Sequence, residues 1–273
     1  MATKIIHQMH HLEESSLPPL LKLGAATMKA KNPGWTYKYW TDRDLIGLME
    51  KEYPSLLPIF KGCKTGVQRG DMGRLLVLYH EGGVYVDLDI EARRNFERLF
   101  EYADEKKFIV AAEPAEQVAL LYAGINKNKN YLCNAFIYAP PRFPLVKRFL
   151  DIIENMYHQY GDAIFNQFDI FGAKMLSTVY SSQGQRSQFS IIDTELIYPI
   201  NDLKLKTLPS YERDIAFLNN LTACAELANS AAETIMIHYW VHGDFEGKSM
   251  LPKFLLSSDS LAQNFLKFVE AVY

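Results

Sequence analysis

Apolar and polar positions along the chain follow two different periods. Runs with the alternation or the apolar density of strands lie at residues 4–8, 35–40, 84–89, 108–113, 132–139, 189–192 and 235–240. Between them, the spacing of amphipathic helices occurs at residues 17–31, 44–51, 67–80 and 144–160. Thr41 and Asp42 are suited to cap the second of these helices. Strands that alternate with helices predict an α/β sheet. No repeat or linker divides residues 1–273, so we expect a single domain.

The helix predicted at residues 67–80 carries two charges within an apolar stretch. Asp71 and Arg74 are three residues apart, and at about 100° per residue they share a helix face. Val67 and Leu78 belong to the same face, so we expect both charges to point into the protein. The pair is consistent with a binding site, and also with a buried ion pair that holds the helix against the sheet.

Two aspartates end the strand that follows this helix. Gly82 and Gly83 stop the helix, because glycine tolerates the left-handed conformation of a helix end. Successive side chains of a strand alternate between its faces, so Tyr85, Asp87 and Asp89 are predicted on one face. The two aspartate Cβ atoms would then lie roughly 6–7 Å apart, close enough for both carboxylates to bind one divalent cation. Oxygen ligands favour Mn²⁺ or Mg²⁺ over zinc.

Each of the other candidate residues has two interpretations. A DXD sequence by itself is often only a solvated strand end. His238, which lies between apolar residues, is consistent with a core histidine or with a metal ligand. Trp40 belongs to an aromatic run that is more typical of packing than of base stacking, although one ring could do both. Asn134 could cap the end of a strand or contact a sugar.

Composition excludes some classes of partner. The chain has 273 residues and a formal net charge of −3, which provides no electrostatic basis for binding nucleic acid or an anionic membrane. The cysteines Cys63, Cys133 and Cys224 lack metal-ligand spacing and are expected to be reduced thiols. No apolar stretch is long enough to span a membrane, so we expect a cytoplasmic protein without a transmembrane segment. A C-terminal apolar stripe is expected to dock onto the core, with peripheral membrane contact as the alternative: Leu261, Phe265, Phe268, Val269 and Val272.

Five sequence blocks carry a resemblance to a known family. They are KIIHQ at residues 4–8, NPGWTYKYWTD at 32–42, GDMGRLLVLYHEGGVYVDLD at 70–89, LCNAFIYAPPRFP at 132–144 and IHYW at 237–240. In this order they resemble the motifs of family 32 type glycosyltransferases, the yeast-type mannosyltransferases and bacterial capsular polysaccharide enzymes with a DXD motif. The resemblance implies a GT-A type fold, in which helices flank a single Rossmann-like nucleotide-binding sheet and further helices are added. Phe171-Gly172-Ala173 departs from the Thr-Gly-Pro-like turn of the family.

The resemblance also implies which residues form the site. Asp87 would contact the donor ribose and the metal, Asp89 the metal, and His238 the metal or the diphosphate. Asp71 and Arg74 would contact the hydroxyls of the donor sugar, and together with the two aspartates they are the expected catalytic residues. The expected contacts to the nucleotide sugar are Ile6, His7, Gln8, Trp40, Tyr85 and Asn134.

The function implied is that of a metal-dependent, retaining glycosyltransferase. It would use Mn²⁺ or Mg²⁺ and transfer a sugar from a GDP- or UDP-linked donor, either GDP-mannose or a UDP-hexose, to a hydroxyl of a glycan or glycolipid. One alternative is a toxin-like transferase that glycosylates a host protein. A second is a protein that binds metal or nucleotide without catalysis, and a third is a structural α/β domain that binds neither.

Overall fold

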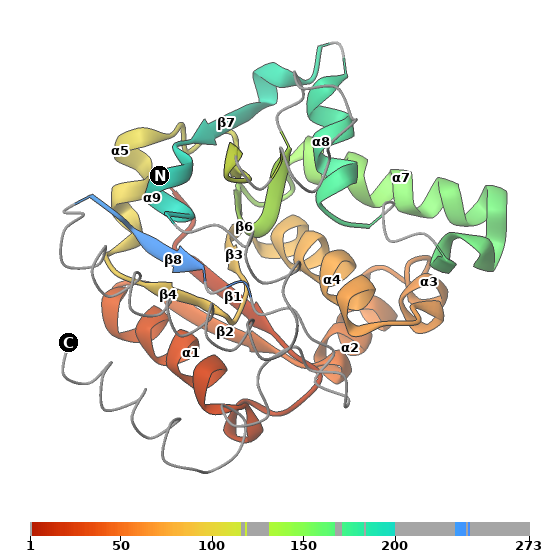
Figure 1. Ribbon diagram of the computed structural model, residues 1–273. Helices are drawn as coiled ribbons and strands as arrows, with labels where there is room; N and C mark the ends of the chain where they lie inside the picture. The colour runs from red at the N-terminus through yellow and green to blue at the C-terminus, as the bar shows by residue number, and fades with distance from the viewer. Residues whose placement is uncertain are drawn as a thin grey trace, which may run out of the picture.

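Six strands form the central sheet of the protein (Figure 1). The computed structural model describes residues 2–115, 118, 131–166, 171–182, 184–199, 233–238 and 240. The sheet has the order β2-β1-β3-β6-β5-β7, and its strands are Thr36–Trp40 (β2), Ile5–Met9 (β1), Gly83–Val86 (β3), Leu132–Ala139 (β6), Phe108–Ala112 (β5) and Phe189–Ile192 (β7). A second sheet pairs Ile90–Ala92 (β4) with Met236–His238 (β8) in antiparallel orientation.

Strand directions in the central sheet are mixed. β1 is parallel to β2 and β3, and β5 is parallel to β7, whereas β6 is antiparallel to both of its neighbours. Helix α1 (Pro19–Lys31) connects β1 to β2, because parallel neighbours require a crossover that returns the chain to the same edge of the sheet. The arrangement confirms the predicted α/β class and is consistent with the single nucleotide-binding sheet that the family resemblance implies.

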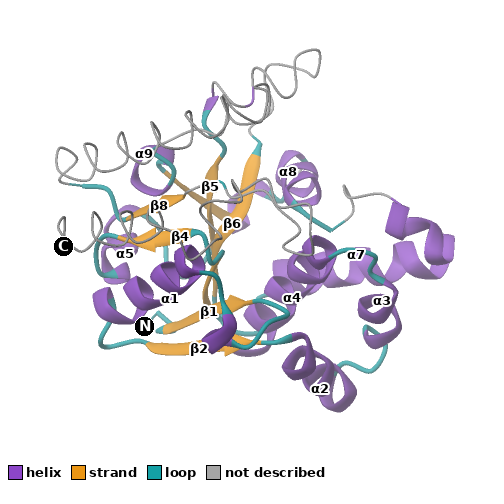
Figure 2. Cartoon of the chain, turned by 60° about the horizontal axis from the view of Figure 1, so that its bottom comes forward, coloured by secondary structure: helices purple, strands orange, loops and turns teal. Residues whose placement is uncertain are grey.

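Helices cover both faces of the central sheet (Figure 2). One side holds α2 (Asp42–Glu52), α3 (Leu57–Gly62), α4 (Gly66–Glu81), α7 (Pro144–Tyr160) and α8 (Ala173–Ser181). The other side holds α1, α5 (Leu99–Tyr102), α9 (Thr194–Ile197) and the second sheet. Short 3₁₀ turns span Glu14–Ser16, Phe96–Arg98, Gly161–Asn166 and Arg186–Gln188. The two faces have separate apolar cores, and β3 contributes to both: Tyr85 packs in one, and Val84 and Val86 pack in the other.

The helix that carries the two charges begins and ends as its sequence predicts. Its last residue is Glu81, and Gly82 follows with a φ of 69°. A Cβ atom at Gly82 would lie 2.4 Å from the backbone nitrogen of Pro141, so both conformation and space require glycine. Asp71 and Arg74 are each 6% exposed, which confirms that they point inward. Val67 is 54% exposed, so the expectation that it shares their buried face is wrong; it lies in the first turn of the helix.

Long predicted elements agree with the structure, and short ones were missed. The cap of α2 is confirmed, because the Thr41 hydroxyl accepts from the Asp44 backbone N–H while the Asp44 carboxylate accepts from the Thr41 N–H. The strand predicted at residues 235–240 is confirmed only as Met236–His238. Strand β4 and helices α3, α5, α8 and α9 were not predicted, because such short segments have too few positions to display a clear period.

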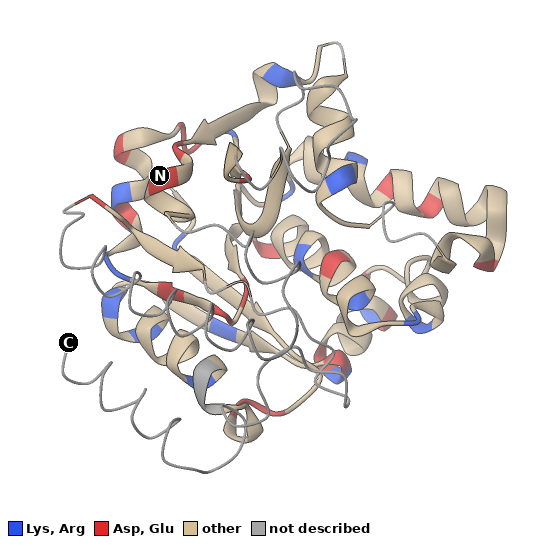
Figure 3. Cartoon of the chain, viewed as in Figure 1, with Lys and Arg blue, Asp and Glu red and all other residues tan. Residues whose placement is uncertain are grey.

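Several expectations concern the surface or the chain beyond the described residues. Cys63 and Cys133 are buried free cysteines, while Cys224 and the apolar stripe at residues 261–272 lie outside the described residues. Among the described residues, no helix combines the length and the apolar character needed to cross a bilayer. In the view of Figure 3, basic and acidic residues are interspersed over the described elements rather than gathered into one basic face.

Candidate active site

The two aspartates of the DXD sequence lie in a turn directly after β3. The backbone N–H of Asp87 donates to the carbonyl of Ala135 on β6, and the ladder of β3 ends there. The backbone N–H of Ile90 then donates back to the carbonyl of Asp87 at 3.1 Å. The prediction that both aspartates project from one strand face is therefore wrong. The chain turns because Leu88 packs into a separate apolar cluster with α1, which leaves an aspartate on either side of it.

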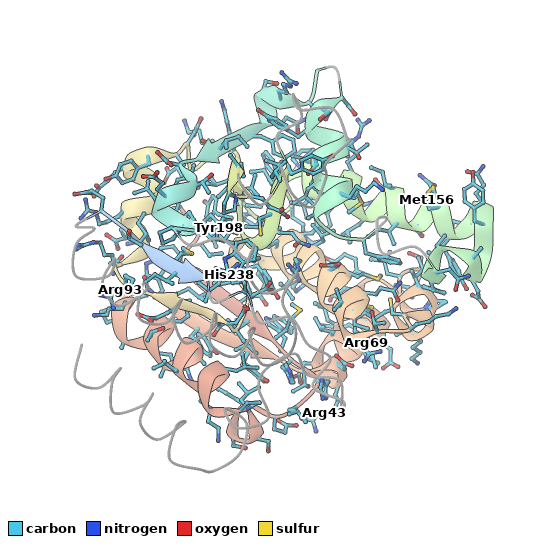
Figure 4. The ribbon with its side chains drawn as sticks, in the orientation of Figure 1. Arg43, Arg69, Arg93, Met156, Tyr198 and His238 are labelled. Atoms are coloured by element: carbon cyan, nitrogen blue, oxygen red, sulfur yellow. The ribbon has the colours of Figure 1, made fainter. Side chains whose placement is uncertain are left out.

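A histidine from the second sheet joins these aspartates. Strands β4 and β8 pair so that His238 lies opposite Ile90, next to Asp89. His238 Nε2 is 3.2 Å from Asp89 Oδ2, and one ligand atom from each of Asp87, Asp89 and His238 lies within 4.8 Å of the others. Figure 4 shows His238 near the centre of the molecule. Two carboxylates and one imidazole at this separation fit a divalent cation such as Mn²⁺ or Mg²⁺.

Arg74 connects the cluster of candidate metal ligands to Asp71, an acidic residue of helix α4. Its Nη2 atom is 3.1 Å from Asp71 Oδ1 and 3.4 Å from Asp87 Oδ1. Its Nη1 atom donates to the backbone carbonyl of Asn134, and its Nε donates to the carbonyl of Gly70. The Asn134 side-chain amide donates to Asp71 Oδ1 at 2.7 Å. Asp71 and Arg74 thus form the buried ion pair that was one alternative, and the same pair borders the candidate metal ligands.

Three carboxylates lie close together in this network. Asp71 and Asp87 contact the guanidinium of Arg74, and Asp89 contacts the imidazole of His238. Burial raises the pKa of Asp71 to about 6, against the opposing effect of Arg74. Burial also raises the pKa of Asp87, again opposed by Arg74, with the charge of Asp89 acting in the same direction as burial. A bound divalent cation would favour the ionised forms of these carboxylates.

Tyr85 orients the first aspartate of the DXD sequence. Its hydroxyl donates to Asp87 Oδ1 at 2.6 Å, and its ring lies 4.7 Å from the Arg74 guanidinium carbon. The Tyr85 side chain is 2% exposed. Tyr85 therefore contacts both Asp87 and Arg74 and holds them in place.

Strand β1 also contacts the turn that contains the DXD sequence. The Gln8 side-chain amide donates to the backbone carbonyl of Asp87 at 3.2 Å, and its oxygen accepts from the hydroxyl of Tyr37. Ile6 packs in the apolar core. Both side chains are buried, and their predicted contact with a nucleotide stays a prediction.

His7 is a neutral imidazole in the core, held at both ring nitrogens. Its Nε2 donates to the carbonyl of Gly82 at 2.8 Å, because a carbonyl can only accept. Its Nδ1 accepts from the indole N–H of Trp40 at 3.1 Å. Burial lowers the pKa of His7 to about 4. His7 and Trp40 thus link β1 and β2 to the glycine turn that leads into β3, and a direct role in nucleotide binding stays a prediction.

Three residues near the site were not predicted as part of it. Gly172, at the start of α8, lies against the carboxylate of Asp71 on helix α4. A Cβ atom at Gly172 would be 2.8 Å from Asp71 Oδ2. The departure at Phe171-Gly172-Ala173 was the one signal of its importance. Tyr198 and Trp240 contact His238. Trp240 belongs to the IHYW block, whereas no local pattern distinguished Tyr198 from other core aromatics.

Comparison with known proteins finds similarity to glycosyltransferases over part of the chain. Residues 18–108 match the profile described as "Glycosyltransferase sugar-binding region containing DXD motif". The chain is 29% identical over 103 residues to inositol phosphoceramide mannosyltransferase 1 of Schizosaccharomyces pombe, covering 37% of this chain and 32% of that protein. It is 34% identical over 99 residues to a mannosyl phosphorylinositol ceramide synthase of Saccharomyces cerevisiae, covering 36% of this chain and 25% of that protein. The chain thus matches a third or less of the length of these two fungal relatives.

A third relative matches over a longer range. An uncharacterised glycosyltransferase of Acanthamoeba polyphaga mimivirus is 26% identical over 213 residues, which cover 77% of this chain and 78% of that protein. Among solved structures, the galactosyltransferase LgtC aligns with a TM-score of 0.47 at 12% identity, covering 98% of this chain and 95% of that one. Residues 18–108, which include Asp71, Arg74, Asp87 and Asp89, are thus similar to the DXD-containing sugar-binding region of glycosyltransferases.

Proposed function

We propose that this protein is a metal-dependent glycosyltransferase that transfers a hexose from a nucleotide sugar to a hydroxyl of a glycan or glycolipid. The observation that carries the proposal is the continuous network at the end of β3. The candidate metal ligand Asp87 is joined through Arg74 to Asp71, and Asp89 lies beside Asp87. All four residues lie inside the region that matches the sugar-binding profile.

Asp87, Asp89 and His238 are the residues that would hold Mn²⁺ or Mg²⁺. Such a cation supplies positive charge to the diphosphate of a nucleotide sugar and so makes it a better leaving group. The protein already orients one of these ligands in the absence of the cation. Tyr85 fixes one oxygen of Asp87 by a hydrogen bond, which leaves the other oxygen available to a ligand.

Asp71 and Arg74 are suited to hold the donor sugar. The carboxylate of Asp71 accepts hydrogen bonds from hydroxyls, and it is oriented by Asn134 and Arg74. Arg74 cannot lose its proton and presents several donors in a rigid plane, so it can hold a hydroxyl or phosphate oxygen in one position. Positioning of this kind lowers the barrier by fixing the reacting groups before reaction.

We propose that transfer proceeds with retention of the anomeric configuration. The carboxylates of the described network already have partners: Asp71 contacts Asn134 and Arg74, and Asp87 and Asp89 belong to the candidate metal centre. We therefore assign none of these three carboxylates as a covalent nucleophile. The acceptor hydroxyl would attack on the face from which the diphosphate departs, and that diphosphate would accept its proton.

The names of the fungal relatives suggest a donor and an acceptor. These proteins are mannosyltransferases of inositol phosphoceramide, and the match to them covers the sugar-binding region. We therefore propose GDP-mannose as the first donor to test, with UDP-hexoses as the second, and a glycolipid as the first acceptor. Protein acceptors belong in the same screen.

The test is thermal stability with GDP, UDP, GDP-mannose, UDP-glucose, UDP-galactose and UDP-N-acetylglucosamine, each with Mn²⁺ and with EDTA. A ligand that binds only the folded protein raises Tm, by an amount that corresponds to about 2.7 kcal/mol at a hundredfold excess over Kd. We expect a rise for one nucleotide family that EDTA abolishes, followed by transfer of labelled sugar from the matching donor. If no nucleotide raises Tm in the presence of Mn²⁺, the proposal is wrong.

A further inference from the structure

His238 lies within a group of three aromatic rings. The ring centroids of His238 and Trp240 are 4.1 Å apart, and those of Tyr198 and His238 are 5.6 Å apart. Tyr198 and Trp240 also contact each other, with centroids 5.6 Å apart. All three side chains are buried. In Figure 4, Tyr198 and His238 are labelled beside each other at the centre of the molecule. The imidazole therefore has two larger rings as its immediate neighbours.

Backbone pairing alone gives His238 little support. Strand β8 has three residues, and His238 is the last of them. Trp240 has a φ of 53°, a left-handed conformation that a bulky residue adopts rarely and keeps only where its surroundings enforce it. Side chains two residues apart in an extended strand would lie roughly 6–7 Å from each other. The 4.1 Å separation shows that the indole is packed directly against the imidazole.

Tyr198 ties this aromatic group to the strand that leads to the aspartates. Its hydroxyl accepts a hydrogen bond from the backbone N–H of Phe136 at 3.0 Å. Phe136, on β6, pairs with Val86, the residue immediately before Asp87. The ring of Tyr198 thus has a fixed position relative to the DXD turn, and it contacts His238 from that position.

We propose that Trp240 and Tyr198 are positioning residues of the metal centre, which hold the imidazole of His238 so that its Nε2 stays directed toward Asp89. The inference rests on the proposed function, because it takes His238 as a metal ligand. It extends that function to two residues that touch neither substrate nor metal. An imidazole that binds a cation becomes partly positive, and the face of an indole stabilises positive charge. Removal of groups that orient metal ligands typically weakens metal binding about 10- to 100-fold.

The experiment measures Mn²⁺ binding by calorimetry on the full chain, with and without the nucleotide that raises Tm. Trp240→Leu removes the ring and Trp240→Phe keeps a smaller one. Tyr198→Phe removes only the hydroxyl, with its hydrogen bonds to the Phe136 N–H and to Cys133. We expect Kd for Mn²⁺ to rise about tenfold or more for Trp240→Leu, and less for the two phenylalanine variants. Trp35→Phe is the matched control, because Trp35 is a buried tryptophan that packs on Phe96 and Phe100, and its Kd should not change.

Tryptophan fluorescence provides a second readout that does not depend on activity. Mn²⁺ is paramagnetic and quenches a nearby indole, so binding to wild type should quench emission. Trp240→Phe should lose that quenching, and Trp35→Phe should keep it. This loss shows only that Trp240 lies near the ion. If Trp240→Leu does not fold, Tyr198→Phe, which keeps the indole, tests the positioning role: half-maximal quenching should require more Mn²⁺ than in wild type.

The outcomes separate this inference from the proposed function. If wild type binds Mn²⁺ and both Trp240 variants bind it with the same Kd, the positioning role is wrong while the proposed function stands. If wild type binds no Mn²⁺ with any nucleotide, the proposed function fails and this inference fails with it. Weaker binding in Trp240→Phe, with a Tm close to that of wild type, would support the inference.

Discussion

The side-chain amide of Asn134 donates a hydrogen bond to the carboxylate of Asp71 at 2.7 Å, although the two residues are 63 positions apart in the chain. This contact joins the middle of the central sheet to the helix that packs on it. It also fixes one oxygen of a carboxylate that has little contact with water.

Asn134→Ala should therefore affect both stability and catalysis. Loss of a hydrogen bond to a buried carboxylate is expected to lower the free energy of unfolding by about 1–3 kcal/mol. We expect the KM for the donor to rise as well, because Asp71 is no longer oriented. Chemical denaturation and donor titration measure the two effects. Asn166→Ala, which removes an exposed amide that binds Lys64, is the control and should change neither.

Arg74→Lys should not behave as a conservative change. Lysine keeps the positive charge but cannot reach Asp71, Asp87 and the Asn134 carbonyl at once, as the planar guanidinium does. We expect the free energy of unfolding to fall by about 2–3 kcal/mol, the size of one hydrogen bond to a charged group. We expect the loss in kcat/KM, expressed as a free energy, to be larger than this. Arg43→Lys changes an exposed arginine and should leave both unaltered. Equal activity of Arg74→Lys and wild type would remove Arg74 from the proposed site.

Gly172→Ala should reduce donor binding. The added Cβ atom would lie 2.8 Å from Asp71 Oδ2, so the carboxylate or the start of α8 must move. Gly47→Ala is the control within helix α2, where a Cβ meets nothing within 4 Å. Because alanine favours helix, that variant should gain up to about 1 kcal/mol in stability and keep full activity. A Gly172→Ala protein with wild-type affinity for the donor would show that this space is not used.

His7 should make stability depend on pH in the acid range. Its folded pKa of about 4 lies below the ordinary value of 6.5, so the unfolded chain binds a proton first as pH falls. The contribution is complete above pH 6.5 and is lost between pH 6.5 and 4, by about 3 kcal/mol in total. Protonation would also put a second N–H against the indole N–H of Trp40.

The measurement compares wild type with His7→Gln, by denaturation at pH values from 7 down to about 4. Asp71 acts in the opposite direction, because its pKa is raised to about 6, and the comparison of the two proteins cancels that effect. Wild type should lose more stability than the variant over this range. His158→Gln, on the exposed face of α7, is the control and should follow wild type.

Asp89→Asn should abolish metal-dependent transfer while the fold stays intact. The amide has the shape of the carboxylate but lacks its charge, so the candidate metal centre loses one of two anionic ligands. The increase in Tm on addition of Mn²⁺ and nucleotide should disappear together with transfer. Asp151→Asn, an exposed aspartate on α7, should retain both. Near wild-type turnover of Asp89→Asn would count decisively against the site.

Much of the central sheet and the DXD region could be predicted from local patterns. The run of apolar residues around Asp71 and Arg74, the glycines at 82 and 83, and the alternation through Tyr85 all act within a few residues of one another. Helix period, helix termination and strand alternation are local properties of the backbone, so a sequence displays them directly. The family resemblance rests on the same blocks, and for this reason it was confirmed.

Only tertiary packing determines which residues far apart in the chain come into contact at the site. The aspartates at 87 and 89 were predicted together for a wrong reason: they converge through a turn that Leu88 anchors on α1, not through a shared strand face. His238 reaches them through a three-residue strand pairing, and His7 is buried because Trp40 and Gly82 satisfy both of its nitrogens. Local spacing determines where a side chain points along its own element. Which side chains then touch depends on how elements far apart in the chain exclude water from their common surfaces, and no local pattern contains that information.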